Sequence, residues 1–372
     1  MSITRREAMT AVFEGRPLDK LPVSVRLDLW HKDLVSSGCV PKAITGLSQE
    51  EVEDYLGFAR AARYRKSQPA FRFRSWEERA VTDGDVTRHE YVFPERVLAK
   101  ETARSAEMVR QGIKGHALSY PLKERADYDV MIAHMEDAYL DFDLQGFCEL
   151  DEATGDAGLP LLILGSCPAH GLMLGWAGYE NFYYHRADFG ETVDLLIEQR
   201  ERIYRRDLWP ALRDSPAYLI LHGVHFNTQM TPPPVFERYF LPYFREFNQA
   251  MHEFGKKVLF HADAEMGGLV RHVMEAGFDG ADCLATAPLV PQRLEDFLEA
   301  WQGKIVCWGG LPSILFDPSF PMSSFEKYVS HMIDLVRKRN DFIFGASDNV
   351  MPGAEWQRLL FLAKATGCAV GG

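Results

Sequence analysis

The chain has 372 residues, a formal net charge of −12 and a hydrophobic content of 47%. This length accommodates two ordinary domains or one large α/β barrel, and the ordinary apolar fraction argues against disorder. The acidic charge argues against nucleic acid or an anionic membrane surface as the main partner.

Cysteine usage and hydropathy indicate the compartment. The six cysteines are dispersed without a CxxC pair, which is typical of reduced thiols. Residues 1–15 lack the apolar core of a signal peptide, and no apolar run approaches the roughly eighteen residues of a membrane span. We therefore expect a cytoplasmic protein. The sequence does not fix the number of subunits, and a homodimer is compatible with it.

The first predicted elements are a helix and a strand. Thr4 is a typical N-cap and Gly15 a typical terminating glycine, which predicts a helix between them. Two prolines then lead into a strand near residue 23, whose end carries Arg26 and Asp28. A buried salt bridge and a role in a pocket are both open for this pair.

Residues 31–120 are predicted to form an irregular excursion. A helix is expected over 48–64, and a polar, β-rich segment with alternating side chains over 71–120. A solvated face accounts for the many Arg and Lys residues of this segment better than a pocket for an acidic substrate does.

From Pro121 onward, helices and strands alternate. Helices are predicted over 127–142, 187–212, 233–255, 268–277, 291–303, 325–339 and 355–367. Strands are predicted within 159–171, 217–226, 257–260, 278–287, 304–312 and 341–349. Such alternation implies parallel strands joined by right-handed crossovers. A single (β/α)₈ TIM-type barrel is the economical solution, with its chemistry at the carboxyl ends of the strands.

Two metal-capable side chains end the strand predicted over 257–260. His261 and Asp263 are two residues apart, so alternation along a strand points both toward one small volume. Local hydrogen bonding of both side chains is the alternative. No GxGxxG, P-loop or GxSxG motif is present, so nothing supports a nucleotide-phosphate site or a serine hydrolase.

Other residues near strand ends are candidates for substrate chemistry. His222 and His225 are candidate catalytic residues because imidazole titrates near neutrality, although a structural histidine is as good an interpretation of either. His170 lies in a loop after a strand and is a candidate substrate contact. Trp30 and Trp308 are candidate walls for an aromatic ring, with core filling as the alternative for Trp308.

Several segments are distinctive as longer strings. They are TRREAMTAVFEGRPLDKLPVSV, FERYFLPYFREFNQAMHEFGKKVLFHAD, VMEAGFDGADCL, KIVCWGGL and FGASDNVMPGAEWQRLLFLAK. Together they resemble the uroporphyrinogen decarboxylase superfamily over nearly the whole chain. The resemblance implies one barrel domain over residues 1–372, with residues 31–120 as an excursion covering it.

The resemblance is nearer to one of two branches of that superfamily. True decarboxylases carry an RQAGRY-type segment after the first strand, whereas this chain reads RLDLWHKDLVSSG and keeps only Arg26. The cobamide-dependent methyltransferases hold zinc with a His-x-Cys at one strand end and a Cys four residues before a late proline. The corresponding residues here are His261, Asp263 and Asp348, which stands four before Pro352.

The exchange of two thiolates for carboxylates changes the expected chemistry. A His/Asp/Asp site leaves a divalent metal more Lewis-acidic than a thiolate-rich site, which suits polarising the oxygen of a methoxy group. The resemblance thus implies zinc, or another divalent ion, on these residues, with Cys283 or Glu265 replacing a carboxylate if one points away. The alternative is that the ligand set is lost and Asp348 caps the last loop.

These features together predict a corrinoid-dependent methyltransferase of the O-demethylase type, acting on a small O-methyl compound. The chain lacks a DxHxxG corrinoid-binding pattern, so cobalamin is expected on a separate partner protein. One alternative is a decarboxylase of a small aromatic or heterocyclic acid, or less favourably of uroporphyrinogen. In it Arg26 would hold the carboxylate and Asp28 or His222 would supply the proton. A further alternative is a binding or regulatory barrel without turnover.

Overall fold

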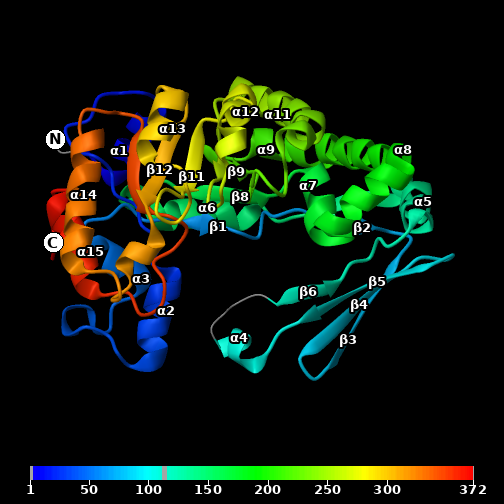
Figure 1. Ribbon diagram of the computed structural model, residues 1–372, viewed down its shortest axis with the longest axis horizontal. Coiled ribbons are helices and arrows are strands. Elements are labelled where there is room, and N and C mark those ends of the chain that lie inside the picture. Colours follow the sequence, from blue (N-terminus) through cyan, green and yellow to red (C-terminus); the bar gives the residue numbers. More distant parts are fainter. Residues whose placement is uncertain (1–2, 111–114, 372) are drawn as a thin grey trace. The chain divides into compact units, whose positions relative to one another are not determined.

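The computed structural model describes residues 3–110 and 115–371, and Figure 1 labels its helices and strands. The contacts between residues divide the chain into two compact units. Unit 1 consists of the described residues within Met1–Gln68, Asp143–Gly165 and Pro216–Gly372, and unit 2 of those within Pro69–Phe142 and Ser166–Ser215. The expectation of one domain stays a prediction.

Seven parallel strands form the sheet of unit 1. In sheet order they are β1 (Arg63–Tyr64), β8 (Leu161–Gly165), β9 (Leu219–His222), β10 (Lys257–His261), β11 (Gly280–Leu284), β12 (Val306–Leu311) and β13 (Phe342–Ala346). Five of them, β8, β9, β11, β12 and β13, are buried at every residue, as parallel strands are when both sheet faces are covered. Because all pairings are parallel, the carboxyl ends of these strands lie at one edge of the sheet.

Hydrogen bonds continue beyond both edge strands of this sheet. Val23 forms a parallel bridge with Phe344 of β13, and Ser24 donates its backbone N–H to the Phe344 carbonyl over 2.8 Å. The Val23 carbonyl in turn accepts from Ala59, four residues before β1, over 2.7 Å. The segment around Val23 therefore forms an isolated bridge to β13 and a hydrogen bond to the residues before β1, where the sequence predicted a strand.

Helices accompany the strands of unit 1. They are α1 (Arg5–Phe13), α2 (Asp28–Ser37), α3 (Gln49–Tyr55), α6 (Gln145–Thr154), α10 (Pro233–Val235), α11 (Leu241–Glu253), α12 (Val270–Glu275), α13 (Leu294–Trp301), α14 (Met322–Val336) and α15 (Trp356–Ala365). Thr4 caps α1 in a capping box, as predicted. A π-helical turn, Phe236–Phe240, joins α10 to α11.

One hydrophobic cluster of unit 1 lies where α1 packs against the sheet. Leu219, Leu221 and Leu259 of the central strands pack with Met9 and Val12 of α1, all nearly inaccessible to solvent. This packing holds the strands in register and thereby fixes the positions of the residues that follow them.

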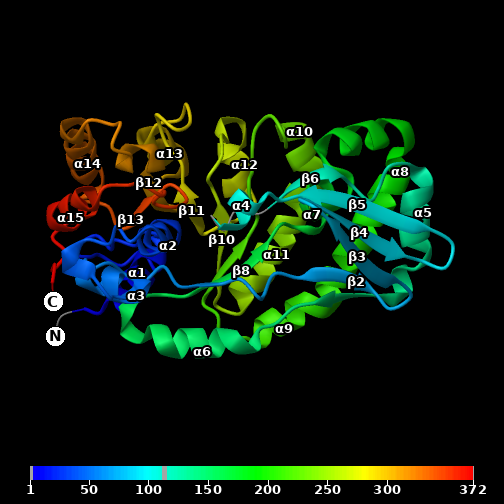
Figure 2. The same ribbon diagram turned by 90° about the horizontal axis from the view of Figure 1, so that it is seen from below.

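Unit 2 contains the antiparallel pairs and five helices. β2 (Ala70–Phe73) pairs with β7 (Ala138–Asp141), while β3 (Glu77–Asp83), β4 (Val86–Val92), β5 (Val97–Ala103) and β6 (His116–Ser119) form a four-stranded sheet, in which Figure 2 shows β3, β4 and β5 side by side. The helices are α4 (Ala106–Arg110), α5 (Arg125–Ala133), α7 (Pro168–Leu172), α8 (Tyr179–Ile203) and α9 (Trp209–Asp214). The expected β-rich segment over 71–120 is therefore present.

Two predicted helices were too long. The helix expected over 48–64 ends at Tyr55, because Gly57 follows in a left-handed conformation (φ +70°), and residues 63–64 are β1. The helix expected over 127–142 ends at Ala133, and β7 follows. None of the helices in the described residues combines the length and the apolar character needed to cross a bilayer.

Candidate active site

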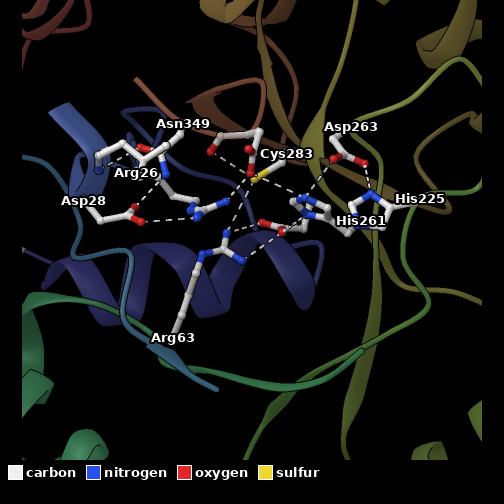
Figure 3. A network of polar contacts seen from close by, with 11 residues as sticks. Arg26, Asp28, Arg63, His225, His261, Asp263, Cys283 and Asn349 are labelled. Atoms are coloured by element: carbon white, nitrogen blue, oxygen red, sulfur yellow. Dashed lines mark hydrogen bonds and ion pairs between the residues drawn. The ribbon is translucent and has the colours of Figure 1, made fainter. Parts of the chain in front are cut away.

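Side chains from three strands converge where β10, β11 and β13 end (Figure 3). His261 is the last residue of β10, Asp282 and Cys283 lie near the end of β11, and Asp348 follows β13 by two residues. The sheet register pairs His261 directly with Asp282. Residues far apart in sequence therefore become neighbours because parallel strands end at the same edge.

His261 lies between carboxylates on both sides of its ring. Its Nδ1 is 3.0 Å from Asp282 Oδ2, so Nδ1–H donates to that oxygen. Its Nε2 is 3.4 Å from Asp263 Oδ2 and 3.5 Å from Asp348 Oδ1. Asp263 also bonds to His225 through Oδ1, which is 3.1 Å from His225 Nδ1. The exposed His225 thus stands at the solvent end of a chain of alternating imidazole and carboxylate groups.

Arg63 neutralises the carboxylate beneath His261. Its two terminal nitrogens donate to the two oxygens of Asp282 over 2.9 and 2.5 Å, and one of them lies 3.7 Å from Cys283 Sγ. The Asp282 side chain is fully buried and that of Arg63 is 9% exposed. The pair therefore holds a rigid, charge-compensated platform for the imidazole.

A second arginine, Arg26, connects the segment before α2 to the loop that follows β13. Arg26 pairs with Asp348 and lies 3.4 Å from Asp28 Oδ2. Asn349 donates to the other oxygen of Asp28 over 2.8 Å. Asp28 is the first residue of α2 rather than part of a strand, so its carboxylate also sits favourably at a helix N-terminus.

The network holds its groups in their charged forms. Burial opposes protonation of His261, but nearby Cys283 and the hydrogen-bonding carboxylates of Asp263, Asp282 and Asp348 outweigh it and raise the pKa of the imidazole well above its usual value. Burial likewise opposes ionisation of the three carboxyl groups, yet the pKa of each is lowered, that of Asp263 by His225 and His261, that of Asp282 by Arg63 and His261, and that of Asp348 by His261 and Arg26. A cluster of opposite charges in a shielded place is typical of functional sites.

The backbone around the cluster is strained. Four described residues other than glycine have a positive φ, and three of them are His225 (φ 51°), Cys283 (57°) and Asp348 (61°). Cys283 occupies an irregularity in the pairing of β11 with β12, between Asp282 and Leu284. Such bulges re-aim side chains, and strained residues persist where function requires them.

Two groups of donors around His261 fit a metal ion differently. Among the described residues, one group has donor atoms mutually within 4.8 Å, namely His261, Asp282 and Cys283. Asp282, however, already accepts hydrogen bonds from Arg63 and His261. A cation there would lie beside the Arg63 guanidinium, which opposes binding.

The donors around Nε2 of His261 form a second, more open group, in which Asp348 Oδ1 also accepts a hydrogen bond from Arg26. Its distances to Asp263 and Asp348, 3.4 and 3.5 Å, match the spacing of about 3.3–3.6 Å between two ligands of a tetrahedral ion bound at 2.0–2.2 Å. The two carboxylate oxygens do not lie within 4.8 Å of each other, so an ion held by all three residues would draw them together. Asp282 then plays the part of the carboxylate that orients a metal-binding histidine through its other nitrogen. One imidazole and two carboxylates suit zinc or a related divalent ion.

Several predicted residues do not join this network. His222 is fully buried and bonds to Tyr243 Oη and the Gly165 carbonyl over 2.9 and 3.2 Å. His170 belongs to unit 2, where it bonds to Tyr179 Oη over 2.7 Å.

The two tryptophans predicted to wall the pocket and the alternative metal ligand Glu265 also have local partners. Trp30 is buried, donates to the Ala354 carbonyl and stacks on Trp356. Trp308 is part of the core and donates to Ser24. Glu265 accepts from the Gly267 backbone and from a glutamine side chain.

Three members of the network were missed from the sequence. Arg63 lay inside a stretch expected to be helical. Asp282 was overlooked beside Cys283, although Asp282 and Cys283 both lie in β11, a strand that was predicted correctly. Asn349 was not singled out. A signal for Asp282 existed, because an ionisable residue inside an otherwise apolar strand needs a buried partner.

Comparisons with known proteins bear on the fold. No family model matches the chain, and no curated protein does. Among solved structures, the chain is similar to a methyltransferase from Methanosarcina mazei, with a TM-score of 0.61, 11% identity and coverage of 98% of each chain. At this identity the likeness concerns the fold alone. A spore cortex-lytic enzyme, SleL from Bacillus megaterium QM B1551, reaches a TM-score of only 0.32 at 10% identity over 61% of this chain and 64% of that chain.

Proposed function

We propose that the protein is a metal-dependent methyltransferase that moves a methyl group from a small O-methyl compound to a corrinoid carried by a separate protein. The observation that carries the proposal is the setting of His261, whose Nε2 faces two carboxylates at ligand spacing while Asp282 holds Nδ1. The full-length likeness to a solved methyltransferase supports a suitable scaffold, and substrate and acceptor rest on the sequence resemblance.

The chain's own residues supply binding and proton transfer. His261, Asp263 and Asp348 would hold a divalent ion, and such an ion supplies Lewis acidity that helps an alkoxide or phenoxide leave. Asp282 and Arg63 orient the imidazole. His225, hydrogen-bonded to Asp263 and accessible to solvent, is placed to pass a proton to the departing oxygen.

We further propose that unit 1 is the predicted closed barrel. The backbone bonds that link Val23 to Phe344 and to Ala59 support closure through an eighth strand position. A barrel would gather every strand end around one mouth, which agrees with the network at the ends of β10, β11 and β13. Cytoplasmic location and dimerisation stay predictions.

A decarboxylase is the second candidate. It is favoured by the guanidinium groups of Arg26 and Arg63 in the site, although both are already paired with aspartates. A decarboxylase acts without a partner, whereas the methyltransferase needs its corrinoid acceptor, so partner dependence separates the two.

Elemental analysis of the purified protein tests the metal first. We expect about one divalent ion per chain, lost in His261→Ala and strongly reduced in Asp263→Asn and Asp348→Asn. His222→Phe is the matched control and should retain the metal, because His222 lies outside the network.

Methyl transfer from an O-methyl compound to a corrinoid protein is then measured on the same variants. The metal-depleted variants should lose about 100-fold or more in rate. Wild-type protein that binds no divalent ion, even when supplied with zinc, would sink the metal mechanism and favour the decarboxylase.

A further inference from the structure

A cavity of about 400 Å³ borders the candidate active site. Its walls come from α3, α6 and the segment that leads into β1. Asp28 and Arg63 line the cavity and also belong to the network around His261. The remaining lining residues are Gln49, Glu50, Glu53, Arg60, Ala61, Ala62, Arg65, Leu150, Ala153 and Thr154.

One positive charge of this cavity has no counter-charge in contact. Arg60 pairs with Asp54 and Arg63 with Asp282. The Arg65 side chain, in contrast, makes no hydrogen bond or ion pair with any residue that the structure describes.

Arg65 stands among other guanidinium groups. Arg65 is exposed to solvent, yet partial desolvation of its guanidinium and the positive charges of Arg26 and Arg63 lower its pKa despite the opposing charges of Asp28 and Asp348. An anionic ligand would therefore be attracted there and would find a planar fork of free donors.

Glu53 forms a buried wall of the same cavity. The residue is 1% exposed, and its Oε1 accepts from Gln49 Nε2 over 3.0 Å. Burial raises the pKa of Glu53 to about 8, with smaller contributions from Glu50 and Asp54 on its own helix, while the hydrogen bond from Gln49 and the charge of Arg60 oppose the shift. At neutral pH the side chain thus adds no negative charge and offers a hydroxyl donor to a ligand.

We propose that this cavity binds the carboxylate group of the substrate, which pairs with Arg65 and accepts a hydrogen bond from Glu53. The inference rests on the proposed function and names its substrate class, a small methoxylated carboxylic acid. A ligand anchored there by its carboxylate would extend past Arg63 and Asp28 toward His261, since these residues line both places.

Calorimetric titration with 4-methoxybenzoate and methoxyacetate tests the proposal, with 4-methoxybenzamide as the uncharged counterpart of the first. At least one carboxylate should bind the wild type, and Arg65→Gln should weaken that binding about 10–100-fold, with Arg65→Lys between the two. The amide should bind all variants alike. Lys66→Gln, which removes an exposed positive charge next in sequence and outside the cavity lining, is the matched control and should change affinity less than about twofold.

The pH dependence provides a second measurement. Affinity of the wild type for the carboxylate should fall as pH rises through about 8, because Glu53 then ionises beside the bound anion. Glu53→Gln should bind with a flat profile between pH 6 and 9. The charged groups near Glu53 are Glu50 and Asp54 on its own helix and Arg60 on the segment before β1. The pKa of Asp54 is lowered and that of Arg60 is raised, so both stay charged over this range.

The outcomes separate this inference from the proposed function. The binding assay needs neither metal nor corrinoid, so binding that depends on Arg65 without methyl transfer would leave the cavity site standing and overturn the function. Binding unaffected by Arg65→Gln, amide binding as tight as that of the carboxylate, or no carboxylate binding at all would overturn the inference whatever the transfer assay gives.

Discussion

Two buried histidines at the ends of neighbouring strands have opposite surroundings. His222 of β9 is enclosed by the rings of Tyr243, Phe244 and Phe247, and burial lowers its pKa to about 3. His261 of β10 is nearly as buried, but its carboxylate neighbours raise its pKa. Burial and position at a strand end therefore do not identify a functional histidine. The charges that the fold places around it do.

The largest predicted effect is the loss of folding stability when Arg63, whose charge compensates Asp282 beside His261, is replaced. Arg63→Met would leave the fully buried Asp282 without its guanidinium partner, and breaking a buried ion pair in this way costs about 3–5 kcal/mol of unfolding free energy. Denaturant unfolding at neutral pH measures the loss. Arg79→Met is the control, since Arg79 and Glu77 form an exposed pair, and it should leave the stability nearly unchanged. Equal losses in the two variants would show that Asp282 does not depend on Arg63.

A smaller effect is expected from changing the carboxylate that orients His261. Asp282→Asn keeps the shape but weakens the hold on Nδ1, and loss of such an orienting partner lowers metal affinity about 10–100-fold. Competition with a metal-binding dye measures the affinity. Asp279→Asn, which alters a carboxylate just before the same strand and outside the network, should leave the affinity unchanged. Complete loss of binding in Asp282→Asn alone would instead make Asp282 a direct ligand.

The parallel strands β8 to β13 were predictable because apolar runs of the right length lay between helical patterns, whereas β1 fell inside a predicted helix. His261, Asp263 and Asp348 were selected through strand position and family resemblance, and the structure brings them to within 3.5 Å of one ring nitrogen. Parallel pairing brings these residues together, because it places the carboxyl ends of the strands at one edge of the sheet without any further signal in the sequence.

Arg63 and Asp282 were missed for physical reasons. The pattern over 48–64 stays helical in composition, and only Gly57 marks the end of α3, where an added Cβ would lie 2.9 Å from the Ala369 carbonyl oxygen. The long-range contact that forbids a side chain there has no trace in local sequence. The irregularity at Cys283, which turns two successive residues of β11 to the site, is equally a product of tertiary pairing.

The smallest effect should come from the His222 region. The Gly165 carbonyl can only accept, so His222 Nδ1 carries the proton and Nε2 accepts from the Tyr243 hydroxyl. Tyr243→Phe removes that one neutral hydrogen bond and should cost about 0.5–1.5 kcal/mol of unfolding free energy, with metal content unchanged. Denaturant unfolding of the wild type and the variant measures the change in unfolding free energy, and elemental analysis measures the metal content.

The pH profile sharpens this prediction. The pKa of folded His222, about 3, lies below its ordinary value near 6.5, so the unfolded chain binds a proton that the folded chain does not as pH falls between these values. This contribution to stability is thus complete above about pH 6.5 and is lost on acidification. The loss comes from burial, which Tyr243→Phe retains, so the curves of variant and wild type should run parallel over this range. Curves that converge on acidification, or a variant that loses its metal, would place His222 in electrostatic contact with the network around His261 and remove the contrast between the two histidines.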